Sequence, residues 1–418
     1  MLKGFLFLTG AAVLFFAAGC AKKQKPVIEP EKVPTPLCQV SPKDFVILPW
    51  SWVPAESEIL EGIRECGFNL AGFVNPEALD AVYDAGLQGI VSDPQCHVHG
   101  AHLSLDDAEI ERRVRALTDR CGTHPARYGY YLRDEPPSTD YSNLARWANA
   151  FRKADPDALP YINLFPNYVS LDAMKSWDLT GYEDYIEKFV EIVKPPFISY
   201  DHYALMEDGT LRYGYFQNLE TVRAAALKHN LPFWNIVLSN SHFQYAEPSP
   251  AGFRFQAYTT LAYGGRGISY FTYLSPESGN YRLAPLDQFH HKTPTWDMLR
   301  NVNLQIQKLV PVYIQLKSVN VFHHPEVPDL CRGLDTSAHV KSIEGGNFVV
   351  GEFEGPEKEP YIMVVNKDLH KSFPFGVSFK ETGDIYMINP YTGNTVPWAG
   401  ENNWLAAGQG MLLKLKKK

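Results

Sequence analysis

The chain has 418 residues, of which 45% are hydrophobic and 13% aromatic, so it is long enough for a large buried core and for more than one domain. The formal net charge is −8, and acidic and basic residues are interspersed along the chain. This pattern argues against a basic nucleic-acid-binding surface, and no nucleic acid is expected among the partners.

The first residues have the features of a targeting segment. Lys3 provides a positive charge, and the apolar stretch that follows, residues 4–16, is too short for a typical membrane span. The stretch ends in Ala17-Ala18-Gly19-Cys20, which resembles a bacterial lipobox, although Ala17 stands where Leu is usual. The resemblance implies cleavage before Cys20 and lipidation of that cysteine. The alternative is a secretory peptide with an incidental cysteine.

We therefore expect a lipoprotein signal peptide over residues 1–19 and a flexible tether over residues 20–42, where charged residues and prolines are frequent. The expected location is the bacterial cell envelope, on the periplasmic face or the cell surface, with the membrane as a partner through the lipid on Cys20. The other five cysteines are an odd number and widely spaced, so they indicate no disulfide framework, and no CxxC motif indicates zinc.

From residue 45 onwards, short apolar runs alternate with amphipathic stretches of helical period. Eight near-continuous apolar runs, each followed by a helical stretch, predict a parallel sheet covered on both faces. Eight such units in about 270 residues favour a closed (β/α)₈ barrel, which we place at residues 43–317. The first run is not followed by the glycine-rich loop of a doubly wound nucleotide-binding sheet. The runs are residues 45–52, 68–74, 86–93, 128–135, 159–167, 197–205, 232–240 and 267–274.

After about residue 318 the pattern changes to short alternating runs separated by turn signals such as EGG, YTGN and AGEN. This pattern is typical of an antiparallel sheet. We expect a C-terminal β-sandwich domain over residues 318–418.

Catalytic residues of (β/α)₈ barrels lie at the C-terminal ends of the strands. The side chains at or just beyond these ends are aromatic, amide, imidazole and carboxyl groups, which suit neutral polyols better than phosphate, and no nucleophilic Ser or Cys elbow is present. Three histidines in "HVHGAH" at 97–102 could hold a metal, but a polar loop that lines a sugar site is the favoured interpretation, so no metal and no cofactor are expected. The candidates are Trp50, Trp52, Asn75, His97, Asp134, Glu135, Asn163, Asn167, Asp201, His202, Tyr203, Asn240, His242, Tyr273 and Glu277.

The fourth run ends in "RDEPP" at residues 133–137, an acidic pair before proline. A (β/α)₈ barrel with this feature and a C-terminal β-sandwich resembles the clan A glycoside hydrolases. The resemblance implies that Glu135 is the acid/base and that Asp134 replaces the Asn that binds the hydroxyl beside the anomeric carbon. The chain departs from the clan in the seventh run, "NIVLSNSHF" at 235–243, which has no carboxylate where the clan places its nucleophile.

The sixth run supplies a carboxylate instead, in "ISYDHY", and its Tyr-Asp is similar to the pair that serves the acetamido group in family 18 chitinases. Glycosidic hydrolysis commonly needs two carboxyl groups, and crowding raises the pKa of one so that it serves as the acid. Three schemes stay open: Glu135 with Asp201, Glu135 with Glu277, or Asp134 beside Glu135 as in substrate-assisted hexosaminidases. The remaining candidates would hold substrate hydroxyls.

The sequence thus predicts a lipid-anchored glycoside hydrolase that acts on an oligo- or polysaccharide outside the cytoplasm. The main alternative is a non-catalytic carbohydrate-binding lipoprotein on a barrel scaffold, because the seventh run lacks its carboxylate. A polysaccharide lyase or a metal-dependent esterase is less favoured, for want of metal ligands. The sequence leaves the sugar, the linkage and the oligomeric state open.

Overall fold

The computed structural model describes residues 40–157 and 159–418. Cys20, the expected signal peptide and nearly all of the expected tether lie outside these residues. Within the part of the chain that is described, no helix is both long and apolar enough to cross a membrane.

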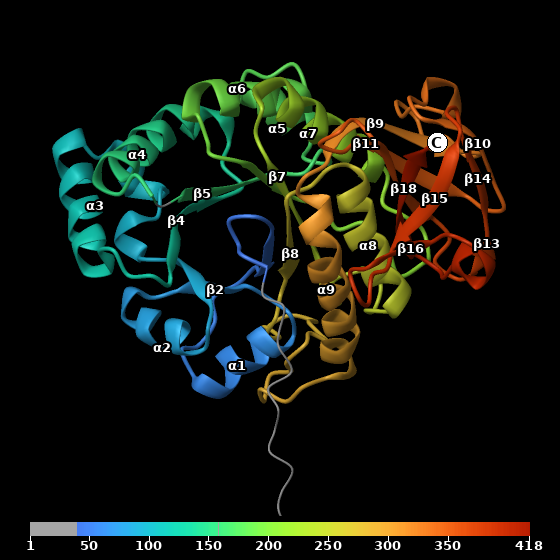
Figure 1. Ribbon diagram of the computed structural model, residues 1–418. Helices are drawn as coiled ribbons and strands as arrows, with labels where there is room; N and C mark the ends of the chain where they lie inside the picture. Colours follow the sequence, from blue (N-terminus) through green and yellow to red (C-terminus); the bar gives the residue numbers. More distant parts are fainter. Residues whose placement is uncertain (1–39, 158) are drawn as a thin grey trace, which may run out of the picture. The chain divides into compact units, whose positions relative to one another are not determined.

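An eight-stranded parallel sheet curls into a barrel, which confirms the predicted (β/α)₈ architecture (Figure 1). The sheet order is β1-β8-β7-β6-β5-β4-β3-β2, and it closes between β1 and β2, where the Asn69 N–H donates to the Ile47 carbonyl at 3.2 Å and the Phe73 N–H to the Ser51 carbonyl at 2.9 Å. The strands are β1 (Val46–Pro49), β2 (Leu70–Val74), β3 (Gln88–Val91), β4 (Arg127–Asp134), β5 (Leu159–Leu164), β6 (Ile198–Asp201), β7 (Phe233–Leu238) and β8 (Gly267–Phe271).

The helices lie outside the barrel, and several begin at a side chain that caps the helix. Asp106 accepts a hydrogen bond from the Glu109 N–H at the start of α3, and Ser249 accepts one from the Gly252 N–H at the start of α8. The helices are α1 (Ser57–Glu65), α2 (Leu79–Asp84), α3 (Asp107–Cys121), α4 (Tyr141–Ala154), α5 (Leu171–Ser176), α6 (Tyr182–Val193), α7 (Tyr215–His229), α8 (Pro250–Ala262) and α9 (Pro294–Tyr313).

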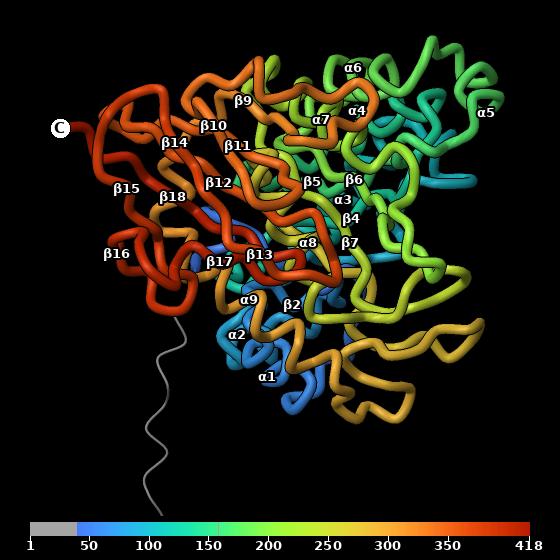
Figure 2. The backbone as a smooth tube through the Cα atoms, turned by 90° about the vertical axis from the view of Figure 1, so that its right-hand side faces the viewer, coloured from blue at the N-terminus to red at the C-terminus, as the bar shows by residue number. Residues whose placement is uncertain are grey.

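An antiparallel β-domain follows α9, as the sequence predicts (Figure 2). Its main sheet has six strands in the order β16-β15-β18-β12-β11-β9, and two further pairs, β10-β14 and β13-β17, accompany it. The strands are β9 (Lys317–His324), β10 (Val340–Glu344), β11 (Phe348–Glu354), β12 (Pro360–Asn366), β13 (Phe373–Pro374), β14 (Gly376–Phe379), β15 (Gly383–Ile388), β16 (Thr395–Pro397), β17 (Trp404–Leu405) and β18 (Gly410–Lys417).

Both faces of this main sheet are covered, which explains why β11 and β12 read as almost continuous apolar runs. On β11, Val350 packs into the core between the main sheet and β10-β14, whereas Val349 belongs to the core that the sheet shares with the barrel. Helix α8 lies in that second core and is buried nearly all round, as expected of a helix enclosed between two layers. The β-domain is therefore packed firmly against α8.

Gly351 on β11 marks the tightest approach between the β-domain and α8. A Cβ atom at this position would collide with the carbonyl oxygen and Cα of Ala262. We expect Gly351→Ala to destabilise the protein by about 1–3 kcal/mol, because neither backbone can move away without opening the shared core. Thermal unfolding followed by circular dichroism would measure the loss. The control is Gly181→Ala, whose Cβ would meet no atom within 4 Å. Equal melting temperatures for the two variants would contradict the prediction.

Candidate active site

The end of β4 directs two adjacent carboxyl groups to the same place, although side chains of a strand normally alternate between its two faces. An irregularity in the pairing of β4 with β5 places one extra residue of β4 between Tyr131 and Arg133. Such a bulge shifts the alternation by one, so that Asp134 is paired with Asn163 and points into the barrel mouth. The next residue, Glu135, has a φ of 44°, a left-handed conformation that is uncommon outside glycine. These two backbone features bring both carboxyls to the mouth.

Asn163, on β5, connects the carboxyl groups of neighbouring strands. Its Nδ2 donates to Asp134 Oδ1 and to Asp201 Oδ1, each at 3.0 Å, and its own oxygen accepts from Ser199 at 2.9 Å. Its side chain is 1% exposed, so water does not compete for these bonds. Asp201, at the end of β6, lies close enough to Glu135 for the two carboxyl groups to affect each other's pKa. The structure thus brings Asp134, Glu135, Asn163 and Asp201 into one cluster, which we call the carboxyl cluster.

A chain of hydrogen bonds through the barrel interior holds Asn163 in its orientation. Trp50 Nε1 donates to the Tyr161 hydroxyl at 2.8 Å, which lies 2.9 Å from the Ser199 hydroxyl, and Ser199 donates to Asn163. Tyr161 and Ser199 are buried, so the bonds are not exchanged with solvent. Because Ser199 donates to the Asn163 oxygen, the Asn163 amide hydrogens must face the carboxylates.

Burial raises the pKa of all three carboxyls, and for Glu135 and Asp201 the charge of a neighbouring carboxyl adds to the effect. The pKa of Glu135 rises from its ordinary 4.5 to about 7, chiefly because of burial and then because of the negative charge on Asp134. Burial raises the pKa of Asp201 well above its usual range, and the charges of Glu135 and Asp134 add to the effect. Burial also raises the pKa of Asp134, against the donor from Asn163. The cluster therefore retains at least one proton near neutral pH, held between coupled groups.

Arg133 does not enter the cluster, because the bulge in β4 directs it to the other side. Its Nη1 donates to the Val98 carbonyl at 3.1 Å, and its Nη2 lies 3.7 Å from an Asp140 oxygen. Its positive charge still lowers the pKa of Asp134 to some degree. The three carboxyls consequently share no ion pair with an Arg or Lys within the described residues.

The loops after β7 and β8 form a hydrogen-bonded wall beside the cluster. His242 Nδ1 donates to Asn240 Oδ1 at 2.9 Å, and Asn240 Nδ2 donates to the Thr272 hydroxyl at 3.2 Å. The Ser241 and Arg282 backbones exchange two hydrogen bonds of 2.9 Å, which join the two loops. Burial lowers the pKa of His242 to about 4, so the ring is neutral and stacks on Tyr281. The buried bonds of this wall involve no carboxylate, and an exposed ion pair between Arg282 and Glu247, at 3.1 Å, also joins the two loops.

Some of the other sequence candidates support the loops of the mouth. His202 is fully buried and lies 3.0 Å from the Asn218 side chain, whose oxygen also accepts from the Asn167 N–H. The Tyr203 ring stacks on Phe271 with centroids 5.7 Å apart. His97 lies 2.9 Å from the Ser92 hydroxyl and packs edge-on against Tyr131.

The remaining candidates lie apart from the carboxyl cluster. Glu277 is exposed in the loop after β8 and forms no hydrogen bond or ion pair with any other described residue. Asn75 is exposed, and so is Trp52, at 56%. Tyr273 is buried between β8 and α9, where its hydroxyl accepts from Trp296 Nε1 at 3.0 Å. Strand β8 ends at Phe271, so alternation no longer governs where Tyr273 points.

Tyr161, Ser199 and Arg212 belong to the surroundings of the site and are not among the sequence candidates. Tyr161 and Ser199 lie inside apolar runs. A polar residue at an inward-pointing position of such a run is the sequence feature that could have identified them. Arg212 lies 11 residues beyond Asp201, in a loop without a periodic pattern.

The three histidines of "HVHGAH" do not converge on a common point with other ligands. His102 Nδ1 lies 2.6 Å from the His97 carbonyl, and its Nε2 lies 2.9 Å from Arg113. Across residues 40–157 and 159–418, no group of three or more His, Cys, Asp or Glu side chains is arranged to hold a metal ion.

The fold is shared with solved glycoside hydrolase structures. One, described as a glycoside hydrolase, is 11% identical over 90% of this chain and 93% of its own, with a TM-score of 0.58. A family 5 glycoside hydrolase from Bacteroides vulgatus is 11% identical over 89% of each chain, also with a TM-score of 0.58. A β-galactosidase from the psychrophilic Marinomonas ef1 is 13% identical over 66% of this chain, with a TM-score of 0.53, and this chain spans 62% of its length.

No protein-family model and no curated protein sequence matches the chain. The resemblance to barrel glycoside hydrolases is confirmed for the fold. At identities this low the likeness extends to architecture alone, so the chemistry has to be argued from the carboxyl cluster.

The raised pKa of Glu135 predicts that this residue lowers the stability of the protein at alkaline pH. A carboxyl whose folded-state pKa lies above its unfolded value costs nothing below the unfolded pKa, and its cost grows as pH rises through the folded pKa. We expect Glu135→Gln to be more stable than the parent by about 1–3 kcal/mol at pH 8 and equally stable at pH 4. Urea unfolding at both pH values would measure the difference.

The exposed Glu277 provides the control, since Glu277→Gln should change stability at neither pH. A Glu135→Gln protein that is no more stable than its parent at pH 8 would show that the pKa of Glu135 is not raised in the folded protein.

Proposed function

We propose that this protein is a glycoside hydrolase in which Glu135 is the general acid and Asp201 is the second carboxyl group. The observation that carries the proposal is the pair of a half-buried Glu135 and a buried Asp201 at the C-terminal mouth of the barrel, with the pKa of Glu135 raised to about 7. Groups tuned to titrate near the working pH are suited to proton transfer. A purely structural acidic turn would not be expected to gather three carboxyls, one buried and two half-buried, without a paired cation.

In the proposed reaction, the glycosidic bond lies between the two carboxyl groups. Glu135 gives its proton to the leaving oxygen as the bond to the anomeric carbon breaks. Asp201, as the carboxylate, either attacks the anomeric carbon or takes a proton from an attacking water. Because the two carboxyl groups titrate as a coupled pair, the proton that they retain can reside on Glu135. Retaining enzymes hold their carboxyls about 5–5.5 Å apart and inverting ones about 6.5–9.5 Å.

A second scheme uses Asp134 beside Glu135, with the substrate's own acetamido group as the nucleophile. The position of Asp134 supports it, because the bulge and the Asn163 bond aim this carboxyl at the mouth. In that scheme the charge of Asp134 stabilises the cationic intermediate. Under the clan A scheme Asp134 would merely bind a hydroxyl, and Glu277, exposed and without partners, is a weaker second group than Asp201.

Glu135→Gln is expected to reduce the turnover of a cleaved oligosaccharide by about 10²- to 10⁴-fold, because the amide has no proton to transfer. Binding should survive, since the shape is kept. Asp201→Asn should cause a loss of similar size, and the parent's activity should fall as pH rises through about 7. Initial rates of sugar release and calorimetric binding would measure both effects. Glu277→Gln is the matched control and should retain turnover.

The same assay separates the two schemes and the non-catalytic alternative. Asp134→Asn should be mild under the clan A scheme and severe under the substrate-assisted one. Unchanged turnover in Glu135→Gln would contradict the catalytic role of this motif. A parent protein that binds glycans without releasing sugar would be a carbohydrate-binding protein on a barrel scaffold.

We further propose that the protein is anchored to the cell envelope through a lipid on Cys20, as the lipobox-like sequence indicates. We expect Cys20→Ala, produced in a bacterial host, to appear as soluble or unprocessed protein, because the acceptor for the lipid is lost. Membrane fractionation and the mass of the purified protein would test this. Cys38→Ala is the control and should stay with the membrane. Normal membrane association of Cys20→Ala would refute the anchor.

A further inference from the structure

The loop between β6 and α7 carries an arginine held by aromatic rings close to the carboxyl cluster. The guanidinium carbon of Arg212 lies 4.0 Å from the centroid of the Tyr168 ring and 5.4 Å from that of Tyr245. Its Nη1 donates to the Tyr245 hydroxyl at 2.9 Å, and its backbone N–H donates to the Ala204 carbonyl at 2.7 Å. Cation–π contact and these two bonds fix the position of the charge.

Arg212 has no acidic partner among the described residues. Within residues 40–157 and 159–418, no carboxylate lies within 4.0 Å of its guanidinium, whereas Arg282 on the β8–α9 loop pairs with Glu247 at 3.1 Å. The Nε and Nη2 atoms of Arg212 bond to no described residue, and they are not sealed from solvent. Two donors of a rigidly held cation are therefore available to a ligand.

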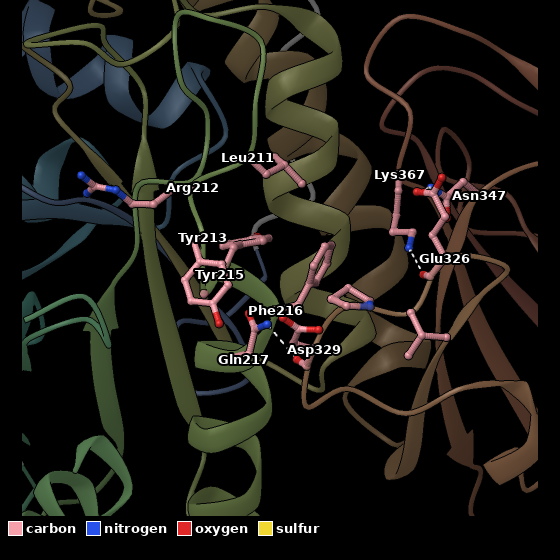
Figure 3. A pocket seen from close by; sticks show the side chains of 13 residues that line it. Leu211, Arg212, Tyr213, Tyr215, Phe216, Gln217, Glu326, Asp329, Asn347 and Lys367 are labelled. Carbon is pink, nitrogen blue, oxygen red and sulfur yellow. Dashed lines mark hydrogen bonds between the residues drawn. The ribbon is translucent and has the colours of Figure 1, made fainter.

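The side chain of Arg212 points away from the β-domain. Arg212 borders a cavity of about 510 Å³ between the loop and the β-domain. Figure 3 shows its side chain extending away from the residues on the β-domain side of this cavity, Glu326 and Lys367. Those two residues bond to each other, from Lys367 Nζ to the Glu326 carbonyl at 2.6 Å.

Aromatic contacts connect Arg212 to the carboxyl cluster. The Tyr168 ring, on which Arg212 lies, packs edge-on against His202 at 5.0 Å, and His202 directly follows Asp201. The Tyr245 ring packs against Tyr203 at 5.6 Å and His242 at 5.0 Å. Burial, and after it the charge of Asp201, raise the pKa of the Tyr168 hydroxyl, which places Tyr168 near Asp201. Tyr168 is 38% exposed.

We propose that Arg212 and Tyr168 form a subsite for an acidic sugar residue, one that carries a uronate carboxylate or a sulfate ester. The proposal rests on the proposed function and names the substrate class of the same site. The planar fork of arginine matches the geometry of both anions, and the exposed Tyr168 ring offers a face for the sugar ring. The positive charge of Arg212 would also offset the repulsion between an acidic glycan and the three carboxyl groups at the barrel mouth.

The test measures binding by the catalytically impaired Glu135→Gln protein, so that it does not depend on turnover. The probes are hyaluronan oligosaccharides and their carboxyl-reduced counterparts, and sulfated galactan oligosaccharides and their desulfated counterparts. We expect the acidic member of at least one pair to bind about 10- to 100-fold more tightly than its neutral counterpart, and less tightly as salt rises. The pair that shows this preference identifies the anion.

The Arg212→Met substitution in the same background should abolish the preference, and Arg212→Lys should retain part of it. Arg115→Met, at an exposed position of the outer helix α3, should leave it unchanged. Melting temperatures verify that each variant folds. If Arg212→Met does not fold, the partial loss of preference expected for Arg212→Lys is the test of the subsite. Equal affinity for acidic and neutral members, or a preference that survives Arg212→Met, overturns the subsite.

Failure of the subsite and failure of the proposed function give different results. Sugar release by the parent protein without any dependence on Arg212 would remove the subsite and keep the hydrolase. Arg212-dependent binding of an acidic glycan without release of sugar would keep the subsite and remove the hydrolase.

Discussion

The bond from one Asn163 amide to two carboxyl groups is the interaction on which the site depends. Asp134 and Asp201 belong to strands on either side of β5, and each accepts from the same nitrogen at 3.0 Å. Without that donor, the half-buried Asp134 and the buried Asp201 would face each other with no compensation, and each carboxyl would either take up a proton or turn away. With it, the carboxyls of β4 and β6 stay in one cluster, and Glu135 lies beside them.

Several features of the barrel hold the carboxyl cluster in place although the stability of the fold does not require them. Tyr161 and Ser199 place polar groups in the barrel interior to orient one amide, and Glu135 adopts a left-handed backbone conformation at the end of a strand. Strain and buried charge of this kind persist where the surrounding structure enforces them, and they concentrate at functional sites. The dense packing of the β-domain on α8 is far from this chemistry and supplies stability of the ordinary apolar kind.

The sequence predicts the architecture well, because long apolar runs in a fixed order with helical stretches allow few folds. It also locates Glu135, Asp201 and Asn163, since all three lie at strand ends where barrel geometry leaves little choice. It cannot decide which of two adjacent residues points inward: the bulge that turns Arg133 out and Asp134 in leaves no clear mark on the pattern. Beyond the strand ends the periodicity stops, which is why Tyr273 lies behind the barrel wall and Glu277 in solvent.

Strand β7 shows how the two halves of the mouth differ. Where the clan A pattern places a carboxylate, Asn240 is held by His242 and Thr272, and all three are buried. A neutral histidine and an amide, cross-linked to the loop after β8, make a rigid surface with no group to exchange a proton near pH 7. Glu135, whose pKa is about 7, directly follows β4, and Asp201 lies at the end of β6, with β5 between the two strands. If glycosidic chemistry takes place in this barrel, it takes place across β5, and the β7–β8 side acts as the surface against which the sugar is held.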